Sequence, residues 1–124
     1  MTEKKLSVLF IEDDAFLAQI YTKAFEDYGL DVSLMGNCED GIKFLSREKP
    51  DIIILDLLLP TMNGFEFIEQ VRANEIWRDI PILVLSNLGQ HDDVVRARQL
   101  GADAYMIKAH ALPQEVINKI RSLT

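Results

Sequence analysis

Cysteine, positive charge and long apolar runs are all scarce in this chain of 124 residues. Cys38 is the only cysteine, which excludes an internal disulfide and a cysteine-based metal cluster; we expect it to be a buried apolar side chain. No apolar run approaches the ~20 residues of a membrane-spanning helix. The 13 lysines and arginines face 20 aspartates and glutamates, and the resulting net charge of −7 argues against nucleic acid as a direct partner.

The first eight residues lack the long apolar stretch and the small-residue cleavage site of a secretion signal. We therefore expect a cytoplasmic protein. The sequence contains no repeat, low-complexity tract or linker, and its length suits a single domain over residues 1–124.

Five short apolar segments are typical of β-strands. The clearest is Ile52–Leu55, because four β-prone residues without polar interruption indicate a strand covered on both faces of its sheet. The predicted strands are Ser7–Ile11, 31–36, Ile52–Leu55, 81–85 and Ala104–Ile107.

Helical patterns alternate with these strands, and Asp14, Asn37 and Asn63 are the expected N-caps. The predicted helices are 15–28, a segment from 37 that ends before Pro50, 64–74, 90–100 and a segment from 113 onward. Apolar positions 17, 20, 21, 24 and 28 are expected to face inward from the first helix, and 112, 116, 120 and 123 from the fifth. Strict alternation implies parallel strands joined by helical crossovers, which is a three-layer α/β sandwich.

Polar side chains stand where the predicted strands end. In a parallel sheet these ends meet at one edge, so residues far apart in sequence become neighbours. The residues concerned are Glu12, Asp13, Asp56, Ser86 and Lys108. Three converging carboxylates repel one another, and a hard divalent cation such as Mg²⁺ relieves that repulsion. Asp56 could then act as a nucleophile toward a phosphoryl group, with Lys108 and Ser86 bonding phosphoryl oxygens.

Several motifs together resemble one family, the receiver domain of bacterial two-component response regulators. They are an acidic pair after the first strand, D-x-x-x-P-x-x-x-G from Asp56 to Gly64, a hydroxyl residue ending the fourth strand, and G-A-D-x-Y-x-x-K ending at Lys108. The resemblance covers the whole chain. It implies a flavodoxin-like α/β fold with a five-stranded parallel sheet of order 2-1-3-4-5 and five helices. We expect no effector domain within residues 1–124, so the chain is interpreted either as a stand-alone regulator or as the receiver of a longer protein.

The resemblance also implies roles. Asp56 would accept a phosphoryl group from a histidine kinase or a phosphotransfer protein, while Lys108 contacts the phosphate. Glu12, Asp13 and Asp56, with the Leu57 carbonyl, would hold Mg²⁺. Ser86 and Tyr105 match the switch positions; packing is the alternative role for Tyr105. Such a chain is a signalling domain that catalyses its own phosphorylation. Its expected partners are a downstream protein target or effector domain and a second copy of itself, through the face of the fourth and fifth helices.

Three features depart from the family pattern. Ala109 stands where a proline usually follows the lysine, which leaves the path of that loop open, and Asn87 replaces a smaller residue after Ser86. Leu58 and Leu88 are apolar where other members orient a hydrolytic water, so we predict slow loss of the phosphoryl group. The alternative hypothesis, kept open by Ala109, is a docking or dimerisation module that works without phosphorylation. Trp77 is expected to anchor a loop against the third helix, and His91 and His110 to lie on the surface.

Overall fold

The computed structural model describes residues 5–124 and shows a five-stranded parallel sheet in the order β2-β1-β3-β4-β5. The predicted alternation and strand order are therefore confirmed. The strands are β1 (Ser7–Ile11), β2 (Asp31–Met35), β3 (Ile52–Leu55), β4 (Ile82–Ser86) and β5 (Ala104–Ile107). Every residue of β3 is fully buried, because this strand lies in the middle of the sheet with both faces covered.

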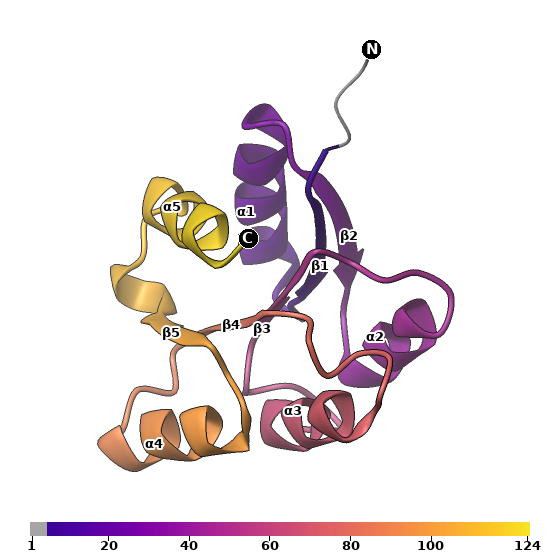
Figure 1. Ribbon diagram of the computed structural model, residues 1–124. Helices are drawn as coiled ribbons and strands as arrows, with labels where there is room; N and C mark the ends of the chain where they lie inside the picture. Colours follow the sequence, from indigo (N-terminus) through magenta and orange to yellow (C-terminus); the bar gives the residue numbers. More distant parts are fainter. Residues whose placement is uncertain (1–4) are drawn as a thin grey trace.

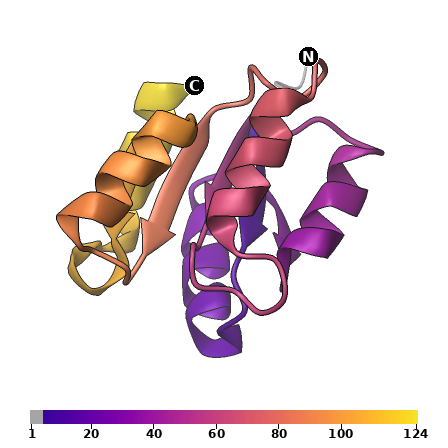
Figure 2. The same ribbon diagram turned by 90° about the horizontal axis from the view of Figure 1, so that it is seen from below.

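Helices cover both faces of the sheet (Figure 1). The helices are α1 (Ala15–Asp27), α2 (Cys38–Leu45), α3 (Gly64–Ala73), α4 (His91–Leu100) and α5 (Pro113–Leu123). α1 and α5 lie on one face, and α2, α3 and α4 on the other, as the view from below also shows (Figure 2). A short 3₁₀ helix, η1 (Lys108–His110), joins β5 to α5.

Each face of the sheet has its own hydrophobic core, because successive side chains of a strand point to opposite faces. In β1, Leu9 belongs to the core under α2, α3 and α4, whereas Phe10 belongs to the core under α1 and α5. Phe10 also packs edge-on against Tyr21 of α1, with ring centroids 6.2 Å apart. The ends of the strands are therefore held in place by a packed core on each face of the sheet.

The three predicted N-caps are confirmed. The Asp14 carboxylate accepts hydrogen bonds from the backbone N–H groups of Phe16 and Leu17 at the start of α1. Asn37 and Asn63 begin α2 and α3 in the same way. Each cap satisfies amide groups that have no partner inside the helix, and so fixes the residue at which the helix starts.

The expected inward face of α1 was partly wrong. Its buried residues are Ala18, Tyr21 and Phe25, whereas Ile20 is 43% exposed and Tyr28 is 48% exposed. The helix turns the 18, 21, 25 stripe toward the sheet, which leaves Ile20 off that stripe, and Tyr28 lies past the last helical residue.

Leu112 was also wrongly expected to face inward from α5, since 67% of it is exposed. It is the N-cap residue of α5, outside the helix proper, and its N–H donates to the Glu115 carboxylate. The strand boundaries moved by one residue: β2 ends at Met35, and β4 runs from Ile82 to Ser86.

The remaining expectations about single side chains were met where the structure describes them. Cys38 is fully buried, and burial raises the pKa of its thiol to about 12. His91 and His110 are exposed, and Trp77 is half-buried against the core under α3. The expectation about an N-terminal signal falls largely on residues 1–4, which lie outside the described residues.

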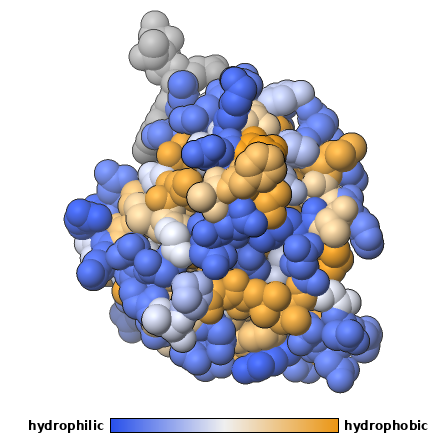
Figure 3. Space-filling view, turned by 180° about the vertical axis from the view of Figure 1, so that it is seen from behind, coloured by the Kyte–Doolittle hydropathy of each residue, from blue (hydrophilic) through white to orange (hydrophobic). Residues whose placement is uncertain are grey.

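The surface seen from behind is largely hydrophilic, with hydrophobic side chains in separate patches (Figure 3). Between residues 5 and 124, no helix has the length and apolar character needed to cross a membrane. The most exposed large apolar side chains are Phe16, Ile76, Leu112 and Leu58.

Candidate functional site

The ends of four strands bring the candidate residues to one edge of the sheet. Glu12 follows β1, Asp56 follows β3, and Ser86 is the last residue of β4. Lys108 follows β5 as the first residue of η1. Because the strands are parallel and neighbouring, these side chains converge although up to 96 residues separate them in sequence.

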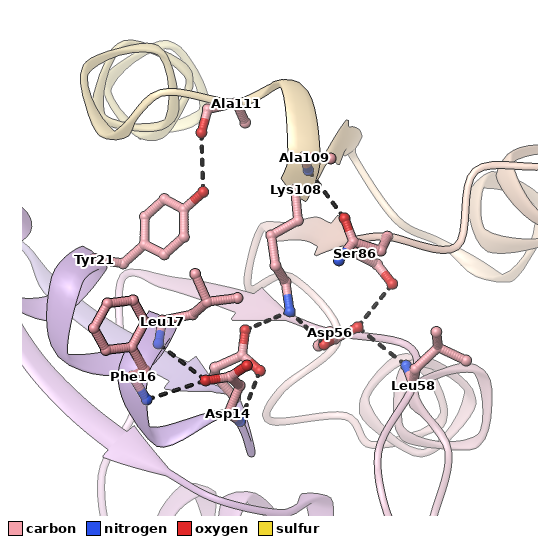
Figure 4. A network of polar contacts seen from close by, with 12 residues as sticks. Asp14, Phe16, Leu17, Tyr21, Asp56, Leu58, Ser86, Lys108, Ala109 and Ala111 are labelled. Carbon is pink, nitrogen blue, oxygen red and sulfur yellow. Dashed lines mark hydrogen bonds and ion pairs between the residues drawn. The ribbon is translucent and has the colours of Figure 1, made fainter.

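The Asp56 carboxylate is the centre of this group (Figure 4). The Ser86 hydroxyl donates a hydrogen bond to its Oδ1 atom over 2.7 Å, and the Lys108 ammonium donates to Oδ2, also over 2.7 Å. The backbone N–H of Leu58 donates to Oδ1 over 3.1 Å. Asp56 is only 5% exposed, so these donors hold a nearly buried carboxylate in a fixed orientation.

Glu12 is the second acid bound by Lys108, with 2.5 Å between Oε1 and Nζ. Its other oxygen accepts the N–H of Asp14 over 3.1 Å. Glu12 is 2% exposed, and this burial raises its pKa although Lys108 acts in the opposite direction. Burial also acts to lower the pKa of Lys108, but its hydrogen bonds to Asp56 and Glu12 outweigh that effect and raise it. The ammonium therefore stays charged at neutral pH.

The carboxylates of Glu12, Asp13 and Asp56 form an acidic cluster, with one oxygen of each lying within 4.8 Å of the others. Asp13 is exposed, so the cluster opens to solvent on that side. One ammonium faces three carboxylates, which leaves uncompensated negative charge. Hard oxygen donors on a partly wet rim suit Mg²⁺, so the donor set present fits that ion.

The Leu57 carbonyl accepts a hydrogen bond from the N–H of Gly64 over 3.1 Å. A carbonyl oxygen has a second lone pair, so this bond is compatible with a metal contact. The contribution of Leu57 to a metal site stays a prediction.

Gly64 allows α3 to begin directly against the backbone that carries Asp56. A Cβ atom at position 64 would lie 2.7 Å from the Asp56 carbonyl oxygen and 2.7 Å from the Leu57 Cα atom. Real Cβ atoms do not approach backbone that closely. The glycine is therefore needed for the close return of the chain after β3.

A chain of hydrogen bonds leads from Asp56 to Tyr105. Ser86 Oγ, which donates to Asp56, accepts the N–H of Leu88 over 3.2 Å, and the Tyr105 hydroxyl donates to the Leu88 carbonyl. Tyr105 is half-buried; burial, followed by the charges of Asp93 and Asp56, raises its pKa to about 12. The two predicted switch residues are thus connected through the backbone of the β4–α4 loop.

Two contacts to the η1 turn were not predicted. The Asn87 side chain accepts the N–H of Ala109 over 2.9 Å, and the Tyr21 hydroxyl donates to the Ala111 carbonyl over 2.9 Å. No peptide bond in residues 5–124 is cis, so the loop after Lys108 follows a trans path as a 3₁₀ turn. The unusual residues at 87 and 109 were visible in the sequence, but nothing there showed that they touch.

The sequence matches the response regulator receiver domain family over residues 8–121. The chain belongs to this family. Phosphorylation on an aspartate is the general function of these receiver domains, which act in two-component signalling.

Individual relatives agree with this assignment. The receiver domain is 34% identical over 119 residues to the DNA-binding dual master transcriptional regulator RpaA of Synechocystis, covering 94% of this chain and 48% of that protein. It is 29% identical over 116 residues to the phosphate regulon transcriptional regulatory protein PhoB of Escherichia coli, covering 94% and 50%. The chain thus spans about half the length of the curated relatives it matches.

Solved structures show the same architecture. The signal receiver domain of a signal transduction histidine kinase from Syntrophus aciditrophicus superposes with a TM-score of 0.86 at 28% identity, covering 94% of this chain and 88% of that one. The chemotaxis response regulator CheY4 of Vibrio cholerae gives a TM-score of 0.90 at 22% identity, covering 98% and 100%, and supports the fold alone.

Proposed function

We propose that this receiver domain accepts a phosphoryl group on Asp56 from a histidine kinase or a phosphotransfer protein. The observation that carries the proposal is the setting of the Asp56 carboxylate, which is held by a hydroxyl and an ammonium beside two further acids. An Asp56 oxygen attacks phosphorus, the bond from phosphorus to the donor nitrogen breaks, and the imidazole leaves with that electron pair. The product is an acyl phosphate on Asp56.

Glu12, Asp13 and Asp56 would hold Mg²⁺, with the Leu57 carbonyl as a further ligand. When bound, this ion would offset the charge of the carboxylates and of the incoming phosphoryl group. Lys108 keeps its charge beside Asp56 and is placed to donate to one phosphoryl oxygen. Ser86 is placed to donate to another, because its hydroxyl already lies on the opposite oxygen of the same carboxylate.

Phosphorylation would be transmitted through Ser86 to Tyr105. When the Ser86 hydroxyl turns to a phosphoryl oxygen, the hydrogen bond from the Leu88 N–H to Ser86 Oγ would change. The hydrogen bond from the Tyr105 hydroxyl to the Leu88 carbonyl would change with it. The face formed by α4, β5 and α5 would then favour one of two conformations, which a downstream protein, an effector domain or a second copy reads. DNA binding is named for relatives about twice as long and is not assigned to this chain.

The phosphoryl group is expected to be lost slowly. Leu58 and Leu88 follow Asp56 and Ser86 by two residues, and neither side chain can hydrogen-bond an attacking water. Decay of the adduct, followed by mass spectrometry after removal of the phosphodonor, should be slow. A lifetime of seconds would contradict this expectation.

The experiment for the main proposal is intact-mass spectrometry after incubation with Mg²⁺ and acetyl phosphate. We expect one acid-stable, base-labile phosphoryl adduct that requires Mg²⁺ and is absent from Asp56→Asn. Asp79→Asn is the matched control, because Asp79 is exposed and precedes β4, at the opposite edge of the sheet. A folded wild-type chain that forms no adduct would reject phosphoacceptor function and favour the docking or dimerisation module.

A further inference from the structure

The turn that carries Lys108 has little internal support. It is a 3₁₀ helix of three residues, in which Ala109 and His110 are exposed. Such short 3₁₀ segments have weaker hydrogen-bond geometry than α-helices, and exposed backbone opens easily. Yet the ammonium at the start of this turn reaches two nearly buried carboxylates, on Glu12 and Asp56. Its placement therefore depends on contacts from other elements.

Two side chains supply those contacts. Tyr21 of α1 holds the far end of the turn through the Ala111 carbonyl. Asn87 holds the near end, since its Oδ1 atom accepts the N–H of Ala109 over 2.9 Å. Asn87 directly follows Ser86, and Ala109 directly follows Lys108. Ser86 and Lys108 bind the two oxygens of Asp56, and the residues that follow them in the chain are joined by this hydrogen bond.

This hydrogen bond requires both of the unusual residues. Ala109 provides a backbone N–H, which a proline would lack. Asn87 provides a side-chain acceptor long enough to reach across to the turn, which a glycine or an alanine would lack. A proline would fix the backbone at position 109 through its ring, whereas here a side chain from the neighbouring loop does so.

We propose that Asn87 is a positioning residue for phosphoryl transfer. Its carboxamide fixes the backbone at Ala109. The turn is thereby held where the Lys108 ammonium and the Ser86 hydroxyl each reach one oxygen of the Asp56 carboxylate. Asn87 acts through the backbone of the turn and need not touch the phosphoryl group itself. The proposal rests on the proposed role of Asp56 as phosphoacceptor, but the hydrogen bond can be tested without any phosphodonor.

The kinetic test compares wild type, Asn87→Ala and the control Asn118→Ala in Mg²⁺-dependent phosphorylation by acetyl phosphate. Asn118 is also exposed and also accepts one hydrogen bond, from Gln114 on α5. We expect Asn87→Ala to react about fivefold more slowly, the factor that corresponds to one ordinary hydrogen bond. Asn118→Ala should react like wild type. Thermal unfolding of each variant checks that the fold is intact.

A spectroscopic test isolates the bond. In ¹H–¹⁵N spectra of the unphosphorylated chain, Asn87→Ala should move the Ala109 amide proton upfield and speed its exchange with solvent. Asn87→Asp keeps the acceptor oxygen and should preserve the exchange protection. An Ala109 amide that is equally unprotected in wild type and in Asn87→Ala would overturn the proposal, whatever the kinetics.

A double-mutant cycle with Ala109→Pro completes the design. Once the N–H donor is gone, Asn87→Ala should have no further effect on the rate, so the two changes should be strongly non-additive. Additive effects, or equal rates for wild type and Asn87→Ala, would overturn the positioning role while leaving phosphorylation of Asp56 intact. Absence of any adduct in wild type would instead overturn the proposed function.

Discussion

Lys108 is the protein's own cation in an acidic site, bound to Glu12 and Asp56 at 2.5 and 2.7 Å. Its ammonium would oppose the arrival of a second cation nearby and, in the proposed reaction, would also donate to a phosphoryl oxygen. These two effects have opposite consequences for metal binding and for phosphoryl transfer, so one substitution should separate them.

We predict that Lys108→Ala binds Mg²⁺ more tightly, by about tenfold, because three carboxylates then lack their fixed counter-charge. Phosphorylation by acetyl phosphate should nevertheless become slower. Isothermal titration calorimetry measures the first effect and mass spectrometry the second. Lys119→Ala, at an exposed position of α5, is the control. Unchanged Mg²⁺ affinity in Lys108→Ala would contradict this prediction, because it would show that the ammonium charge has no effect on Mg²⁺ binding.

If Glu12 is a ligand as proposed, its raised pKa would give Mg²⁺ binding a pH dependence. Protons compete with Mg²⁺ for this carboxylate, so affinity should fall as the pH drops through a value above the ordinary 4.5 of glutamate. In the metal-free chain the raised pKa means that the folded state binds a proton on Glu12 more readily than the unfolded state does. The Glu12 contribution to stability is therefore lost as the pH rises from 4.5 through the raised pKa.

Calorimetric titrations across the acidic range measure this dependence. In Glu12→Gln the fall in Mg²⁺ affinity above pH 4.5 should disappear, whereas Asp13→Asn should retain it because Glu12 is unchanged. A wild-type affinity that stays constant until the pH drops below 4.5 would argue against Glu12 as a ligand.

Gly64 is the residue whose replacement should do most damage near the site. In Gly64→Ala the added methyl group meets the backbone of Asp56 and Leu57 at 2.7 Å, so the β3–α3 turn must open. We expect a loss of about 2 kcal/mol or more in the free energy of unfolding, together with slower phosphorylation. Urea unfolding gives the first value. Gly36→Ala is the control, because a methyl group there meets no atom within 4 Å.

At the scale of elements, Arg72 ties the end of α3 to the segments that enter β4 and β5. Its guanidinium donates to the carbonyl groups of Gly101, Arg78 and Ile80 and to the carboxylate of Asp103. We predict that Arg72→Ala lowers the free energy of unfolding by about 3 kcal/mol, because several of these acceptors lose their donor. Chemical denaturation tests this, with Arg98→Ala, exposed on α4, as the control. A loss within about 0.5 kcal/mol, typical of surface positions, would contradict it.

Much of the element order could be predicted from the sequence. Buried strands of a parallel sheet are apolar on both faces, and this holds for all of β3 and for β4 up to its last residue, Ser86. The residues at or directly after the strand ends indicated which polar side chains gather at the edge, and the structure brings Glu12, Asp56 and Lys108 into contact there. The physical reason is that parallel strands place all their C-terminal ends at one edge of the sheet, and the strand order then determines which ends are neighbours.

Side-chain detail within the helices was harder to predict. Apolar residues also occupy exposed positions, so the periodicity in α1 did not separate Ile20 from the buried Ala18. The bond between Asn87 and Ala109 joins a side chain to a backbone group 22 residues away. It depends on the path of a turn that no local pattern specifies.

At the scale of the whole molecule, the length of the strands separates the edge where the strands end from the edge where they begin. The acidic cluster lies where the strands end, and the α2–β3 and α3–β4 connections lie where β3 and β4 begin. The two cores between these edges are closely packed. Because the length of the strands separates the two edges, we expect a change of bonding at the acidic edge to have little effect on the opposite edge.

The single tryptophan lies at that opposite edge, in the α3–β4 connection, half-buried against the core. Its indole is therefore an intrinsic fluorophore that is remote from the acids yet depends on the packing of the fold. Emission from Trp77 should change strongly on denaturation in urea and remain nearly constant during titration with Mg²⁺ or acetyl phosphate. For this chain, tryptophan fluorescence would measure unfolding free of interference from ligand binding, whereas assays of binding would need a dye attached elsewhere.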